Sequence, residues 1–146
     1  HCGHYGKATP DWRVLCEYDT PPPGVTISGR VLIGAGVKLG GPILELHAGS
    51  STITIGDGCD IGAFTALNCS DSHRRCLGVS DKIDCAPITL GQRVFVGSHC
   101  LIKGGVTIVG RSVVAGGSVV DRGTYAGGSL ILSSPRTITR SLKYAP

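Results

Sequence analysis

One polar segment, CSDSHRRCLGVSDKIDCAP at positions 69–87, holds the residues best suited to catalysis. It contains His73, and Asp71 stands shortly before it. A neutral imidazole can take a proton from a hydroxyl near neutral pH, because its unperturbed pKa is about 6.5. A carboxylate that binds the second ring nitrogen orients the ring, as in catalytic triads. The two residues fit a general base with its orienting partner, and they also fit a polar loop in which His73 is incidental and Asp71 only stabilises the loop.

The chain around this segment repeats every six residues. The aliphatic marks of the repeat fall into three blocks: Ile27, Ile33 and Leu39; Ile55, Ile61 and Leu67; Leu90, Val96, Ile102, Ile108, Val114 and Val120. Small or β-branched residues follow many marks by four positions, at Val31, Val37, Cys59, Thr65, Val94, Cys100, Val106, Ser112 and Ser118. A period of six matches neither a helix nor one alternating strand, but it matches short strands bent at regular corners. The repeat predicts an all-β fold, a parallel β-solenoid with both sets of residues in its core.

The six-residue register slips twice, between Leu39 and Ile55 and between Leu67 and Leu90. The marks make four coils, and residues 40–54 supply most of a fifth. The second slip predicts a loop extruded from the solenoid at about 68–87. The expected parts are an N-terminal segment 1–24 that caps or flanks the first coil, a β-helix domain over 25–122, and a C-terminal tail over 123–146 with a short helix near 136–142.

Composition limits the function classes. The chain has 146 residues, 5% aromatic residues and 23 glycines, so we expect one domain with a core of small aliphatic side chains. It has no apolar run long enough to span a bilayer and no secretory signal, which predicts a soluble protein. The net charge of +4 comes from scattered Lys and Arg and favours an anionic small molecule over nucleic acid. Seven cysteines without a C-x-x-C pair indicate free thiols in a reducing compartment, the cytoplasm.

The stretch from Ile53 to Val120 resembles the hexapeptide-repeat acyltransferases, and most of all the galactoside and maltose O-acetyltransferases. The segments TITIGDGCDIG and APITLGQRVFVGSHCLIKGGVTI resemble their coils, and SVVAGGSVV resembles their cofactor-contacting turn. The resemblance implies a left-handed parallel β-helix, acetyl-CoA as acyl donor without a metal, and a homotrimer with sites between subunits. It also places His73 where the family has its catalytic histidine, near the start of a loop that interrupts the solenoid.

The same resemblance implies the contacts of the donor. The pantetheine arm is expected along Ser98, Gly116 and Gly117, and backbone N–H groups around Gly97 and Ser98 are placed to stabilise the oxyanion. The phosphates are expected near Arg122, Arg136 and Arg140. The tail departs from the family pattern, because YAGGSLILSSPRTITR stands where the family has a short AG-x-P-A-x-x-I stretch.

The acceptor side departs further from the galactoside enzymes. Pro42 and Ser50 fall in the stretch where those enzymes carry an asparagine and an aspartate. Asn68 and Glu45 are the substitutes that the sequence offers. We therefore expect a small acceptor, a saccharide or a similar molecule with a hydroxyl or an amine, without assuming a galactoside or maltose.

Two other functions are compatible with a solenoid. A γ-class carbonic anhydrase type of enzyme binds zinc through three histidines, and His47, His73 and His99 are evenly spaced. Resemblance to that class would require two histidines five residues apart, and this chain has no such pair. A non-enzymatic binding scaffold would show ranks of identical outward residues, such as threonines, and the sequence has none.

Overall fold

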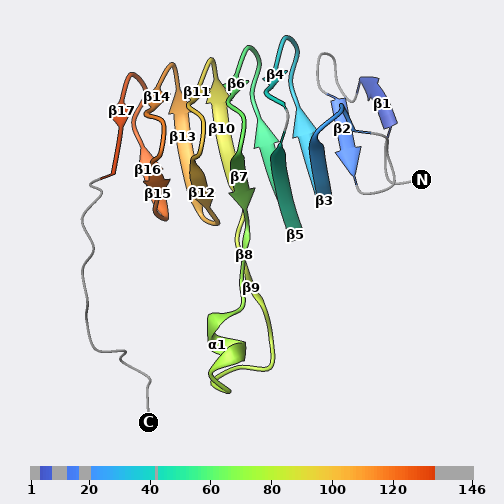
Figure 1. Cartoon of the computed structure of the whole chain (residues 1–146), viewed down its shortest axis with the longest axis vertical. Coiled ribbons are helices and arrows are strands. Elements are labelled where there is room, and N and C mark those ends of the chain that lie inside the picture. The colour runs from blue at the N-terminus through green and yellow to red at the C-terminus, as the bar shows by residue number, and fades with distance from the viewer. Residues whose placement is uncertain (1–3, 8–12, 17–20, 42, 134–146) are drawn as a thin grey trace.

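The six-residue repeat bends the chain into three-sided coils, as the computed structural model shows in Figure 1. The structure describes residues 4–7, 13–16, 21–41 and 43–133. Within them, parallel strands form a left-handed β-solenoid of about five turns, which confirms the predicted fold class. The coils lie side by side across Figure 1, from β3 (Val25–Ile33) to β17 (Leu130–Ile131).

The strands divide among three faces of the solenoid. Face 1 holds the second halves of β3 and β5 (Leu44–Ile55), followed by β10 (Ile88–Gln92), β13 (Val106–Gly110) and β16 (Gly123–Tyr125). Face 2 holds β4 (Lys38–Leu39), β6 (Asp60–Ile61), β11 (Phe95–Val96), β14 (Val113–Val114) and β17. Face 3 holds the first halves of β3 and β5, followed by β7 (Thr65–Asn68), β12 (Leu101–Lys103) and β15 (Val119–Val120).

The repeat positions face the interior, as predicted. In the parallel register Leu90 aligns with Ile55 on one side and Ile108 on the other, so that marks stack on marks. All marks are buried except Leu39, which is partly buried against the same core. This stacking of aliphatic side chains builds a core with few aromatic residues, and burial of apolar surface is its main source of stability.

The second set of repeat positions is also inside. Cys59 and Cys100 are core residues as expected, and only Val37 of the set is partly exposed. The hydroxyls of Thr65 and Ser112 donate to backbone carbonyls of a neighbouring coil or turn. Thr65 Oγ1 donates to the carbonyl of Gly97 at 3.0 Å. Small residues at these positions therefore fill the inside of the corners without leaving polar groups unsatisfied.

The corners require residues with a left-handed backbone. Gly58 (φ 69°) and Gly117 (φ 76°) supply it without a steric cost, because glycine has no Cβ. Phe64 and His99 adopt the same conformation, with φ 58° each, at equivalent corners of adjacent coils. Their rings stack with centroids 4.9 Å apart, so each ring covers the other at this corner.

The N-terminal strands close the first coil. β2 (Arg13–Cys16) pairs antiparallel with β3, and β1 (His4–Lys7) pairs antiparallel with β2. The other end of the described chain is β17, and the predicted helix near 136–142 lies outside the described residues. Within the described residues, no helix is long and apolar enough to cross a membrane.

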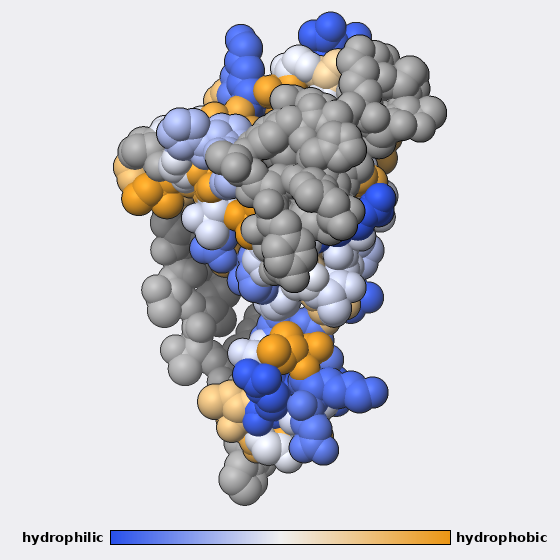
Figure 2. Space-filling view, turned by 90° about the vertical axis from the view of Figure 1, so that its right-hand side faces the viewer, coloured by the Kyte–Doolittle hydropathy of each residue, from blue (hydrophilic) through white to orange (hydrophobic). Residues whose placement is uncertain are grey.

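The two slips of the repeat meet at one corner, between faces 3 and 1. In the first, residues 48–51 of β5 lie opposite the single Gly29 of β3, because the register passes from Ser28 with His47 to Arg30 with Thr52. We call residues 48–51 the bulge. In the second, the chain leaves the wall as an antiparallel ribbon of β8 (Ser70–Asp71) and β9 (Asp84–Cys85), which carries the short helix α1 (His73–Cys76). Figures 1 and 2 show this loop projecting from the body of the solenoid.

Candidate active site

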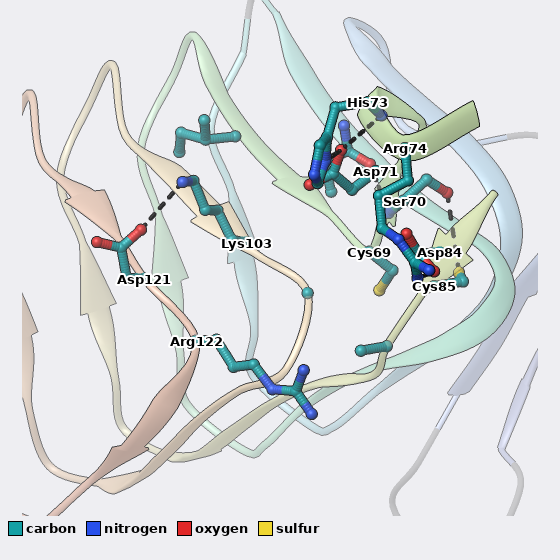
Figure 3. Close-up of a pocket in the computed structure, with 14 residues that line it drawn as sticks. Cys69, Ser70, Asp71, His73, Arg74, Asp84, Cys85, Lys103, Asp121 and Arg122 are labelled. Carbon is teal, nitrogen blue, oxygen red and sulfur yellow. Dashed lines mark hydrogen bonds and ion pairs between the residues drawn. The ribbon is translucent and has the colours of Figure 1, made fainter. Parts of the chain in front are cut away.

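The extruded loop forms one side of a cavity of about 770 Å³ (Figure 3). The ribbon closes the insertion at its base, where Ser70 pairs with Cys85 and Asp71 with Asp84. His73 begins α1 directly after the ribbon and lines the cavity. The solenoid wall forms the other side and contributes Lys103, Asp121 and Arg122. A regular coil has no position from which a side chain can face its own wall, and the loop provides one.

Asp71 holds the ring of His73. The Oδ1 atom of Asp71 lies 2.7 Å from Nδ1 of His73 and accepts the backbone N–H of the same residue at 3.0 Å. The hydrogen bond from the backbone N–H of His73, followed by the one from its ring, lowers the pKa of Asp71, and the charge of Lys103 adds to this. An ionised carboxylate can only accept, so Nδ1 carries the hydrogen and the lone pair of the neutral ring resides on Nε2.

The helix that carries His73 is tied to both strands of the ribbon. The backbone N–H of Cys76 donates to the carbonyl of Ser72 at 2.9 Å, which closes its first turn. Arg74 Nη1 donates to Asp84 Oδ1 at 3.2 Å and joins α1 to β9. Both side chains of this pair are about half exposed (42% each), so its contribution to stability is small and its main effect is to orient the helix.

Positive charge lines the opposite wall. Lys103 Nζ lies 3.0 Å from Asp121 Oδ1, and this ion pair joins two neighbouring coils. The stem of Arg122 lies across Gly105, where an added Cβ would come within 2.7 Å of the Arg122 Cγ atom. Figure 3 shows Arg122 and the Lys103–Asp121 pair across the pocket from His73. A ligand in the cavity would therefore lie between an imidazole and a wall that carries Arg122 and the Lys103–Asp121 ion pair.

The base of the loop holds a second cluster that the sequence analysis missed. Ser70 Oγ lies 3.1 Å from His47 Nε2 and 3.8 Å from Cys85 Sγ. Cys85 Sγ also donates to the carbonyl of Ala48, in the bulge, at 3.2 Å. The available signal was the slip between Leu39 and Ile55, which showed extra residues near 48–51 but not what they would contact.

Two comparisons with known proteins bear on this site. A family model described as the hexapeptide repeat of succinyl-transferase matches residues 87–122, which form the coils after the loop. Among the solved structures, seven chains match. One is the crystal structure of a hexapeptide-repeat-containing acetyltransferase from Vibrio cholerae O1 biovar eltor in complex with acetyl coenzyme A. It is 26% identical, the match covers 75% of this chain and 69% of that chain, and the TM-score is 0.51.

Both matches support the hexapeptide-repeat acyltransferase family. The sequence matches none of the curated proteins. The comparisons thus support the family without distinguishing its galactoside and maltose O-acetyltransferases from its other members.

The cavity of this hexapeptide-repeat chain unites some of the residues expected from the sequence. His73, Asp71, Asn68 and Arg122 all line it. Asn68 Oδ1 accepts the backbone N–H of Ser70 at 2.9 Å, which places this asparagine at the foot of the loop.

The other expected contacts lie elsewhere. The glycine and serine residues assigned to the donor form the corner between faces 2 and 3, where Gly117 N–H donates to the Ser98 carbonyl at 2.9 Å. Glu45 is exposed on face 3, beside Ala66, and does not line the cavity. Arg136 and Arg140 lie outside the described residues. One chain therefore does not bring His73 to the corner of Gly97, Ser98, Gly116 and Gly117.

The three evenly spaced histidines occupy different places. His99 stacks on Phe64 at the corner between faces 2 and 3, and His47 contacts Ser70 at the foot of the loop. His73 is paired with Asp71 on the loop. In the described part of the chain, no group of three His, Cys, Asp or Glu side chains is arranged to hold a metal ion.

Proposed function

We propose that this chain is an acetyl-CoA-dependent acetyltransferase that moves the acetyl group to a hydroxyl or amine of a small acceptor, with His73 as general base. The observation that carries the proposal is the contact of His73 Nδ1 with Asp71 Oδ1 at 2.7 Å, on a loop that faces a cavity. The acetyltransferase of similar fold, crystallised with acetyl coenzyme A, supports the donor. A saccharide is the acceptor class that we expect.

The chemistry follows from the tautomer. His73 Nε2 takes the proton of the acceptor while its oxygen or nitrogen attacks the acetyl carbonyl carbon. The carbon–sulfur bond of the thioester then breaks, and coenzyme A leaves as the thiol after it receives a proton. The ionised Asp71 stabilises the imidazolium that forms in between and keeps the ring oriented. Both partners bind before transfer, in a ternary complex.

A corner of small residues suits the donor. Ser98, Gly116 and Gly117 are exposed between faces 2 and 3, and no large side chain stands on these positions. A thin pantetheine arm can therefore lie close to the backbone there, and Gly97 brings the two coils into contact beneath it. Arg122, Arg136 and Arg140 are the cations proposed to bind the phosphates. Arg122 lines the same cavity as His73, which supports its assignment to the donor or to another anionic group.

The separation of His73 from this corner supports a site shared between two copies of the chain. We propose a homotrimer in which the loop of one subunit lies against the corner between faces 2 and 3 of the next. Apolar side chains are exposed on both sides of this proposed contact. Leu77, Val79 and Ile83 are 43%, 44% and 44% exposed on the loop, and Ile43 and Phe64 are 58% and 45% exposed at the corner. Burial of these side chains would favour the assembly.

Acceptor recognition is assigned to the foot of the loop. Asn68 uses its carbonyl oxygen for the backbone of Ser70, and its NH₂ group remains as a donor for an acceptor hydroxyl. The exposed Glu45 is proposed as a second contact only if the neighbouring subunit brings an acceptor to face 3.

An acceptor screen tests the proposed function. The purified chain is incubated with acetyl-CoA and a panel of saccharides, amino sugars and simple alcohols, and released coenzyme A thiol is measured. Acetylated product, identified by mass spectrometry, supports the proposal when it depends on both substrates and on His73. Binding of acetyl-CoA without transfer to any acceptor, together with tight binding of a protein partner, would favour a non-enzymatic scaffold instead.

A further inference from the structure

A second reactive group, the thiol of Cys85, faces the cavity at the foot of the loop. The proposed acetyl transfer does not use this thiol. Cys85 lies at the end of β9, lines the cavity and is only partly buried. The bulge of β5 approaches it from the solenoid wall, and Ser70 approaches it from β8 (Figure 3). A thiol in this position can be reached by a molecule that enters the cavity.

The bulge brings both donors and one acceptor to the sulfur, since the Cys85 thiol donates to the carbonyl of Ala48 at 3.2 Å. Burial acts to raise the pKa of Cys85, but hydrogen bonds from the hydroxyls of Ser50 and Ser70 and from the backbone N–H groups of Ser50 and Ser51 outweigh it, and the pKa is lowered. The extra residues of the bulge supply most of these donors. An accessible thiol whose thiolate is stabilised in this way is the reactive form of cysteine.

Ser70 connects the sulfur to an imidazole. Its Oγ atom lies between His47 Nε2, at 3.1 Å, and Cys85 Sγ, at 3.8 Å. When Nε2 of His47 carries the ring hydrogen, the Ser70 hydroxyl accepts from it and has its own hydrogen available for the sulfur. The contact between Ser70 and His47 therefore strengthens donation to a thiolate at Cys85.

The neighbouring thiols differ from Cys85. Cys69 is buried, and its burial together with the charge of Cys85 raises its pKa to about 11, so that Cys85 ionises first. Cys76 is exposed on α1, away from the bulge. The other titratable groups near Cys85 are His47, on β5, and Asp84, which precedes it on β9 and pairs with Arg74. The loop thus offers one donor-stabilised thiol, one inert thiol and one exposed thiol for comparison.

We propose that Cys85 is a site of reversible covalent modification, which reacts with a small-molecule disulfide that enters the cavity. The Cys85 thiolate attacks one sulfur of the disulfide, a new sulfur–sulfur bond forms, and the other half leaves as a thiolate. Cys85 is oxidised and the departing half is reduced, so no further oxidant is needed. The adduct occupies the cavity beside His73 and blocks acetyl transfer, a consequence that rests on the proposed function, whereas the modification itself does not.

Labelling of the full chain with dithiodipyridine tests the proposal. The release of pyridinethione gives the rate, and mass spectrometry of the peptides assigns it to each cysteine. At pH 6 we expect Cys85 to react about tenfold faster than Cys76, because a larger fraction of it is thiolate. Ser70→Ala should slow the reaction of Cys85 and leave the reaction rate of Cys76 unchanged. This substitution removes one donor from the sulfur and the link to His47. Equal rates for the two cysteines, or a Cys85 that reacts only in denaturant, would overturn the proposal.

Activity provides a separate readout. Glutathione disulfide should inactivate the wild-type chain, dithiothreitol should restore it, and Cys85→Ser should resist while Cys76→Ser remains sensitive. If Cys85→Ser is inactivated equally, the block arises elsewhere and the proposed effect on transfer is wrong. If Cys85→Ser does not fold, peptide mapping of the wild type and of Ser70→Ala still decides the modification. A chain without any transferase activity would count against the proposed function alone, because the labelling rates do not depend on it.

Discussion

Asp71 Oδ1 lies 2.7 Å from His73 Nδ1, and the same oxygen accepts the backbone N–H of His73 at 3.0 Å. One carboxylate thus fixes both the start of the helix and the tautomer of the ring that this helix carries. The arrangement makes a short polar loop hold an imidazole ring with its lone pair on Nε2.

Replacement of the base should abolish most of the activity. We expect His73→Ala or His73→Asn to lower kcat by about 10²–10⁴, the usual contribution of general-base catalysis, with little change in the affinity for acetyl-CoA. Steady-state kinetics and calorimetric titration with acetyl-CoA measure the two effects. Arg75→Ala is the matched control, because Arg75 is exposed on the same helix and does not line the cavity. Near-normal turnover by His73→Ala would exclude this residue as the base.

Asp71→Asn should leave the loop in place but weaken the base. The amide can hold the wrong tautomer, so we expect kcat to fall at least about tenfold, within the range up to ~10⁴ known for a triad aspartate. The dependence of kcat on pH should be compared between Asp71→Asn and the wild type, since an imidazole base loses activity when it is protonated in acid. A change in kcat without any change in the pH profile would indicate that Asp71 acts only on the fold.

The lowered pKa of Asp71 gives the direction of a pH effect on the loop. The ionised form is favoured in the folded chain, so its contribution to stability is complete above the unfolded pKa of about 3.9 and is lost as the pH falls through the lower folded value. The protection factors of the loop amides, which correct for the intrinsic pH dependence of exchange, should therefore fall in this acid range more in the wild type than in Asp71→Asn. Because Asp71 is largely exposed, salt should reduce the difference.

Substitutions of two glycines on neighbouring coils, Gly97 and Gly116, should distinguish an effect on folding from an effect on donor binding. A Cβ on Gly97 would lie 2.6 Å from the backbone N of Gly116, whereas a Cβ on Gly116 would meet nothing closer than the Ser98 carbonyl oxygen at 3.4 Å. Gly97→Ala should lower the free energy of unfolding by about 1–3 kcal/mol, as overpacking does. Gly116→Ala should change it by less than about 0.5 kcal/mol but raise KM for acetyl-CoA. Thermal melts and kinetics of both variants check this, and equal stability of the two would contradict the packing argument.

Arginine side chains should control affinity for the donor. We expect substitution of Arg122, Arg136 or Arg140 by Ala to raise KM for acetyl-CoA more than it lowers kcat, and added salt to raise the wild-type KM. Acetyl-CoA analogues that lack a phosphate provide the control. Their KM should change less when the arginine that binds this phosphate is replaced. If no substitution changes KM, the phosphates are bound by other groups.

A shared site predicts complementation between subunits. His73→Ala chains lack the base, and Gly116→Val chains carry a bulky side chain on the proposed donor corner. Neither should be active alone, but refolded mixtures should regain part of the wild-type activity if the loop of one subunit meets the corner of another. Light scattering should give a trimer. An active monomer at assay concentration, or mixtures without regained activity, would place the whole site in one chain.

The wall of the solenoid was predictable from the sequence, because each coil repeats the same simple requirement of an aliphatic mark and a small inward residue. Leu90 and Val96 follow this rule as closely as Ile55 and Ile61. The handedness required resemblance to a known family, since the period of six is compatible with either hand. The contact of His73 with Asp71 was foreseen as an option, because the two residues are close in sequence.

The cluster at the foot of the loop was not predictable. His47, Ser70 and Cys85 come from three segments, and only the pairing of β8 with β9 and the contact of β5 with both strands bring them together. A slip of the repeat reveals that residues are inserted, but the direction of an inserted side chain depends on local backbone geometry. The same holds for Arg122, which reaches the cavity because Gly105 leaves room for its stem.

The ends of the loop are joined where it leaves the wall, by the hydrogen bond from Ala86 N–H to the Cys69 carbonyl at 3.1 Å. The wall continues across this gap, since Ile55 still aligns with Leu90 as if nothing were inserted. The entropy of closing a loop grows only slowly with its length, so a longer or shorter insertion between these anchors would cost the solenoid little. Loops of other lengths and sequences could therefore be exchanged at this corner, and the chain could acquire a new acceptor specificity without redesign of its core.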